Sequence, residues 1–127
     1  MLPPVRLALP NAAPHDPNIG LRYFLIGTVH LLQSRTDEAI VWLEKARIAM
    51  PASPLNHGWL ASAYALRGET EPAAAELAEA RRLDSRDLFT SIAQLKAHRW
   101  RSWGPKTRAL WESTFFAGLR KAGMPEE

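Results

Sequence analysis

The sequence predicts an all-α fold, a short α-solenoid of two helix-turn-helix repeats followed by a divergent pair of C-terminal helices. Three observations predict it: apolar residues recur at helical spacing, prolines and glycines separate the helical segments, and matching residues recur 34 positions apart. The residues that match at this offset are Ala39 and Ala73, Leu43 and Leu77, Ala46 and Ala80, Pro17 and Pro51, and Gly27 and Ala61.

Length and composition suit one small globular domain. The chain has 127 residues, of which 46% are hydrophobic and 23% are charged, too apolar for a disordered segment. With no cysteine, disulfides, thiolate metal sites and cysteine nucleophiles are excluded. No apolar run reaches the roughly 20 residues that cross a bilayer, and residues 1–10 make a poor secretory signal. By elimination we expect a cytoplasmic protein that does not bind membranes.

The two repeats are predicted at residues 17–51 and 52–86. In the first, Asp16 is expected to cap a helix over residues 17–33, and Thr36 a second helix over residues 37–50. In the second, the pair Ser53-Pro54 is expected to start a helix that ends before Gly68. Thr70 then opens a fourth helix, which runs to about residue 83.

The two ends differ from the repeats. Residues 1–15 are rich in proline and are either a tail or the remnant of a preceding repeat. Residues 87–127 are predicted to form two capping helices, over residues 87–100 and 106–121, with a break at Gly104-Pro105. Such caps are needed because each repeat of a solenoid buries its apolar face only against a neighbour.

A helix-turn-helix unit of this length, with small residues where its helices cross, resembles the tetratricopeptide repeat. The matching residues of the first repeat are Tyr23, Ile26, Gly27, Ala39, Leu43, Ala46 and Pro51. Those of the second are Leu60, Ala61, Tyr64, Gly68, Ala73, Leu77 and Ala80. The chain departs from the family pattern at His30 and His57, which replace aromatic residues, and at Ser85, which replaces a proline.

The end of the chain has a narrower resemblance. The stretch LWESTFFAGLRKAGMPEE, residues 110–127, is similar to the C-terminus of tetratricopeptide regions in large bacterial regulators. Some of these carry a class III adenylate/guanylate cyclase domain upstream, and others a winged-helix DNA-binding domain. The resemblance covers about residues 16–127 and implies the C-terminal regulatory part of a signalling protein. It does not imply cyclase activity, because no segment matches the cyclase metal-binding aspartates or its transition-state asparagine and arginine.

Residues that could support catalysis or hold a metal or cofactor are few, so we expect a non-catalytic chain without a cofactor. The four histidines, His15, His30, His57 and His98, are not paired at metal-ligand spacing. We interpret His30 and His57 as packing residues. Glu76 and Glu79 share a helix face that we expect to be solvated.

The basic residues are concentrated near the C-terminus, where residues 96–127 hold seven cations and three carboxylates. The run from Lys96 to Arg108 mixes cations with Trp100 and Trp103, a combination that can bind single-stranded nucleic acid. The alternative is that both tryptophans pack under the last helix while the cations face water, or that the segment docks on an acidic partner. We favour the packing alternative and expect no nucleic-acid binding beyond a weak, salt-sensitive attraction.

By resemblance, the first helix of each repeat presents a concave, mostly apolar groove for protein–protein interaction. Its predicted residues are Leu21, Phe24, Thr28, Leu31 and Leu32 in the first repeat and Leu55, Gly58, Ser62, Ala65 and Leu66 in the second. The groove lacks the lysine, asparagine and arginine with which relatives grip a peptide carboxylate. An amphipathic helix suits it better, from a partner protein or from a neighbouring domain of the same polypeptide. A homodimer through the N-terminal helix is a further alternative.

Overall fold

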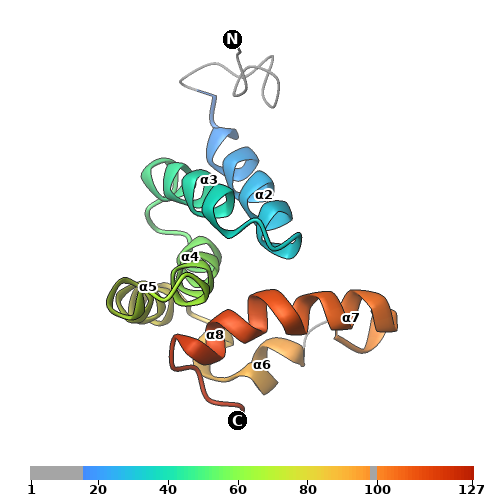
Figure 1. Ribbon diagram of the computed structural model, residues 1–127. Helices are drawn as coiled ribbons and strands as arrows, with labels where there is room; N and C mark the ends of the chain where they lie inside the picture. The colour runs from blue at the N-terminus through green and yellow to red at the C-terminus, as the bar shows by residue number, and fades with distance from the viewer. Residues whose placement is uncertain (1–15, 98–99) are drawn as a thin grey trace.

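The computed structural model describes residues 16–97 and 100–127, so the predicted proline-rich tail and His98 lie outside the described residues. The described part is all-helical (Figure 1). Its elements are α2 (Ile19–Leu32), α3 (Thr36–Ala49), α4 (Pro54–Leu66), α5 (Thr70–Leu83), η1 (Leu88–Thr90), α6 (Ile92–Lys96), η2 (Trp100–Ser102), α7 (Pro105–Trp111), η3 (Glu112–Phe116) and α8 (Ala117–Lys121). Within these ranges, no helix combines the length and the apolarity needed to cross a membrane.

The first four helices form two successive hairpins, α2 with α3 and α4 with α5. The small residues predicted at the helix crossings are fully buried: Ala39 and Ala46 in the first hairpin, Ala73 and Ala80 in the second. Gly27 lies so close to α3 that a Cβ added to it would be 2.7 Å from the side chain of Leu43. Matching positions of the two hairpins therefore share the same packing role.

The helix starts only partly follow the sequence prediction. The Ser53 side chain accepts a hydrogen bond from the Asn56 amide, and Pro54 is in the first turn of α4, as predicted. Asp16, in contrast, accepts from the amide of Asn18 in a turn that precedes α2, so the prediction that it caps this helix is wrong. Thr36 is already the first residue of α3 and does not cap it, since Arg35 occupies the N-cap position.

The predicted continuous helix over residues 87–100 is also wrong. The carboxylate of Asp84 accepts hydrogen bonds from the amides of Leu88 (2.5 Å) and Phe89 (3.2 Å), which fixes the short turn η1. Ser91 is fully extended (φ −155°, ψ 164°), and its hydroxyl accepts from the Gln94 amide to start α6. Both side chains give backbone amides an alternative to helical pairing, and the helix is broken for that reason.

The last predicted helix is present but contains an irregular turn. It starts after Gly104 with Pro105 in its first turn, as predicted, and ends before Gly123, which has a φ of +109°. Between α7 and α8 lies η3, one turn of π-helix. The hydroxyl of Thr114 donates to the carbonyl of Leu110 at 2.7 Å, a side-chain bond of the kind that disturbs regular α-helical pairing.

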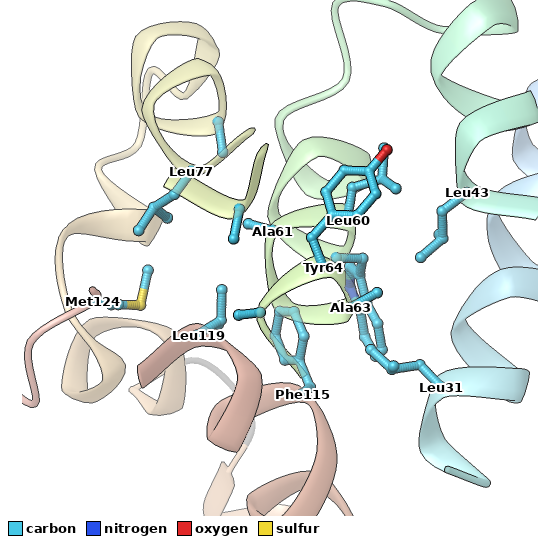
Figure 2. Packing of buried hydrophobic residues seen from close by; sticks show 14 of the residues in the cluster. Leu31, Leu43, Leu60, Ala61, Ala63, Tyr64, Leu77, Phe115, Leu119 and Met124 are labelled. Atoms are coloured by element: carbon cyan, nitrogen blue, oxygen red, sulfur yellow. The ribbon is translucent and has the colours of Figure 1, made fainter. Parts of the chain in front are cut away.

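Residues 87–127, which we call the C-terminal segment, pack directly against α4 (Figure 2). Leu119 is completely buried, and Met124 is 3% exposed. The hydroxyl of Ser62 donates to the carbonyl of Phe115 at 2.8 Å, and a Cβ added to Gly118 would be 2.4 Å from the Ser62 carbonyl oxygen. The helix α8 thus touches the backbone of α4, and the segment covers the face of α4 that the sequence predicts to be open.

Candidate functional site

An open cavity of about 430 Å³ lies between α2, α4 and the C-terminal segment, and we call it the aromatic cavity. Its walls are almost entirely apolar. The residues that line it are Phe24, Leu25, Thr28, Leu32, Leu55, Trp59, Leu95, Lys96, Trp100, Trp103, Trp111, Phe115 and Phe116. A cavity of this size with mostly hydrophobic walls is the usual form of a binding site for an apolar group.

Trp59 of α4 is at the centre of the cavity wall. Its ring stacks on Phe115, with centroids 4.0 Å apart and planes inclined by 16°. It also meets Trp111 at 5.2 Å and Phe24 at 6.3 Å, in both cases edge to face. Such geometries are favourable for aromatic pairs. One residue of α4 therefore connects the first repeat with the C-terminal segment.

Trp100 and Trp103 complete the wall on the C-terminal side. The ring of Trp100 meets Phe116 at 5.4 Å, and the ring of Trp103 meets Trp111 at 4.6 Å. Both tryptophans are half-buried against the last helix. This is the packing arrangement that the sequence analysis favours for the two residues.

The π-helical turn η3 determines how the last helix meets the cavity. Trp111 directly precedes this turn, Phe115 and Phe116 end it, and all three line the cavity. A π-turn widens the helix locally, so that side chains four and five positions apart face the same side. Single π-turns inside α-helices are frequent at functional sites.

One ion pair lies at the cavity edge. Lys96 Nζ is 2.7 Å from Glu112 Oε2 and 4.5 Å from the centroid of the Trp100 ring, an ion pair combined with a cation–π contact. Arg120 contacts the other carboxylate oxygen at 2.9 Å. Partial burial raises the pKa of Glu112, but the hydrogen bonds from Lys96 and Arg120 outweigh it and hold this pKa below its ordinary value.

Four of the ten predicted groove residues line the aromatic cavity: Phe24, Thr28, Leu32 and Leu55. Leu21 is exposed on α2, and Leu66 is half-buried, but neither lines the cavity. The accessible part of the predicted groove is thus made by α2 together with Leu55 at the start of α4.

For the other four predicted groove residues, Leu31, Gly58, Ser62 and Ala65, the sequence prediction is wrong. All are buried, and none is available to a partner in this structure. For Gly58 and Ser62 the physical reason is contact with residues after the second hairpin: a Cβ added to Gly58 would be 2.2 Å from the ring of Phe89, and Ser62 bonds to Phe115. At these two positions the chain itself fills the space beside α4 that the sequence predicts to be open.

Sequence reasoning missed the residues that dominate the cavity. Trp59, Trp111 and Phe115 come together from two segments that are more than 50 positions apart. One signal was present, since five of the 17 residues from 100 to 116 are aromatic and Trp111 precedes Phe115 by one helical turn.

His57 and Glu76 belong to a structural network away from the cavity. The ring nitrogens of His57 are 2.6 Å from Glu76 Oε1 and 2.7 Å from the carbonyl oxygen of Pro51, and Arg47 pairs with the second oxygen of Glu76. The packing role expected for His57 is confirmed. The expectation that Glu76 is solvated is wrong, because its side chain is 12% exposed. Within residues 16–97 and 100–127, no group of three potential ligands could hold a metal ion.

Comparisons with family models, with curated proteins and with solved structures give no match to this chain. The aromatic cavity and its surroundings are therefore the basis for a functional assignment.

Proposed function

We propose that this chain is a protein-interaction domain of tetratricopeptide type and that the aromatic cavity is its binding surface. The observation that carries the proposal is the cavity itself, an open space of about 430 Å³ walled by aromatic and aliphatic side chains. Open apolar surfaces of this kind generally mark sites for a partner.

The exposed apolar residues at the edge of the cavity favour a partner that inserts apolar side chains. Leu25 of α2 is 52% exposed and Leu55 of α4 is 39% exposed, although both border the same apolar space. Covering them would remove further apolar surface from water, at roughly 25 cal/mol per Å². An amphipathic helix, from a partner or from a neighbouring domain of the same polypeptide, offers a matching apolar stripe.

The proposal also covers the context of the domain. The similarity of residues 110–127 to the end of tetratricopeptide regions in bacterial regulators supports a C-terminal regulatory role in a signalling protein. In this role the cavity binds a partner and carries out no chemistry.

A selection experiment with a matched control tests this function. Helical peptides displayed on phage are selected against the full chain, and the enriched peptides are measured on two variants by fluorescence titration. Leu25→Glu places a charge at the cavity edge, whereas Val41→Glu places one on α3, at a residue that is 51% exposed and outside the cavity.

We expect enriched peptides with apolar residues at helical spacing, whose binding is lost in Leu25→Glu and retained in Val41→Glu. Enriched peptides that bind Leu25→Glu as well as the original chain would contradict the proposal. So would a selection that enriches no peptide.

A further inference from the structure

We infer that the partner segment is an acidic amphipathic helix, with apolar side chains in the aromatic cavity and carboxylates on the basic segment of residues 100–108. The inference rests on the proposed function, because it assigns the chemistry of the partner for the same cavity. Two features carry it: the lack of hydrogen-bond acceptors in the cavity wall, and an uncompensated group of cations beside it.

The cavity wall favours a helix over an extended peptide. Among the described lining side chains, the indole N–H groups and Lys96 are donors, and Lys96 already contacts Glu112. The hydroxyl of Thr28 is engaged with the carbonyl of Leu25 at 2.8 Å. An extended peptide would bring backbone N–H groups to a surface with almost no acceptors, which is costly. A helix satisfies these groups internally and presents only its side chains.

The cations next to the cavity are not neutralised. Arg108 donates to the carbonyls of Trp100 (3.0 Å) and Arg101 (2.9 Å), which hold its guanidinium in place without cancelling its charge. Its guanidinium carbon is 5.8 Å from the ring centroid of Trp100, a residue of the cavity wall. Across the described residues, Arg101, Lys106 and Arg108 have no carboxylate partner within ion-pair distance.

The nearby carboxylates are already occupied. Glu112 contacts both Lys96 and Arg120, and Glu126 contacts Arg120. The three cations of residues 100–108 therefore form a local excess of positive charge, and Arg108 places part of it against Trp100 in the cavity wall. A partner with carboxylates next to its apolar stripe would complement both features and associate faster through long-range attraction.

Two other occupants fit less well. Residues 1–15 contain Arg6 and no acidic residue, so the proline-rich tail brings no complementary charge. A single-stranded nucleic acid would need free ring faces for base stacking, but Trp100 and Trp103 contact each other as well as Phe116 and Trp111.

Three synthetic peptides of about four helical turns provide the test. All carry the same leucine stripe, and their other face carries glutamate, glutamine or lysine. Their affinities for the full chain are measured by tryptophan fluorescence at about 50 mM and about 500 mM salt. The double variant Arg101→Gln/Lys106→Gln is compared with Arg86→Gln/Lys121→Gln, which removes two exposed cations outside the basic segment of residues 100–108.

We expect the glutamate peptide to bind at least about tenfold more tightly than the glutamine peptide at low salt, and the difference to shrink at high salt. Arg101→Gln/Lys106→Gln should remove most of the difference, and the control variant should keep it. Equal affinities of the glutamate and glutamine peptides would overturn the acidic assignment and leave the proposed function intact. If none of the three peptides binds, the result would contradict both the acidic assignment and the proposed function.

Competition identifies the other occupants. Displacement of the glutamate peptide by a single-stranded oligonucleotide would overturn the assignment in favour of nucleic acid. Peptide binding that falls as protein concentration rises would indicate a second copy in the cavity. Tighter binding of all three peptides once residues 1–14 are removed would indicate that the tail occupies the cavity.

Discussion

Ala46 and Ala80, at matching positions of the two repeats, show that close packing of the helix crossings depends on small side chains. Both are completely buried where the two helices of a hairpin cross, and Ala39 and Ala73 are equally enclosed. Interiors are packed too densely to accept extra methylene groups without strain. At the residue scale, the register of the repeat is therefore set by positions that admit nothing larger than alanine.

Ala80→Leu tests this register. The larger side chain should overpack the crossing of α4 and α5 and lower the free energy of unfolding by roughly 1–3 kcal/mol, measured by urea denaturation. Ala78→Leu, at an exposed position of the same helix, is the control and should change stability little. An unchanged midpoint for Ala80→Leu would contradict the assigned register.

At the element scale, the contact between α8 and α4 decides what the surface of the molecule offers. Phe115, Leu119 and Met124 fill the space beside α4, and Gly118 allows the two backbones to approach (Figure 2). The amides of Ile92 and Ala93 also donate to the carbonyls of Pro125 and Glu126, so the chain end is tied to the start of α6. The residues that precede α8, Trp111, Phe115 and Phe116, form one side of the aromatic cavity.

Gly118→Ala should separate these two helices. The added Cβ would meet the backbone oxygen of Ser62, which cannot rotate away as a side chain could. We expect a loss of roughly 1–3 kcal/mol in unfolding free energy and a change in tryptophan fluorescence, because Trp59 would lose its stacking on Phe115. Gly104→Ala, with no atom within 4 Å of the new Cβ, should leave the fluorescence unchanged. Equal spectra for the two variants would count against this contact.

The ion pairs of Glu112 connect α6, η3 and α8, and their contribution to the stability of the fold depends on pH. Its folded-state pKa lies below the ordinary value, so the charged form stabilises the fold above the unfolded-state pKa, and this stabilisation is lost as pH falls through the folded-state pKa. The difference in unfolding free energy between the original chain and Glu112→Gln should therefore be largest near neutral pH. It should disappear as pH falls below about 4. Denaturation curves over this range would check it. A difference that does not vary with pH would refute it.

At the scale of the whole molecule, an apolar surface remains on the first repeat. Outside the aromatic cavity, Leu21 and Val29 of α2 are each about half exposed, and Ile48 of α3 is 82% exposed. In a longer array a preceding helix would cover part of this surface, and apolar patches of this kind usually mark an interface.

We predict that the chain either dimerises through α2 or covers that helix with residues 1–15. Light scattering on the full chain and on a form that lacks residues 1–14 distinguishes the two. A dimer in both forms indicates self-association, and a monomer that associates or becomes less stable after truncation indicates cover by the tail. If both forms are equally monomeric, soluble and stable, both versions of the prediction fail.

The sequence by itself determined the helices of the two hairpins and the small residues at their crossings. These features depend on local apolar periodicity and on helix-start residues such as Ser53 and Pro54. They also depend on the sequence repeat, in which matching small residues are buried in both hairpins. Only the tertiary structure decided where the surface is open. The start of α6 is bonded to the carbonyls of Pro125 and Glu126 at the chain end, and the cavity depends on Trp59 stacking on Phe115, 56 positions away. Contacts between segments so distant follow from how whole elements dock, and no local pattern specifies that docking.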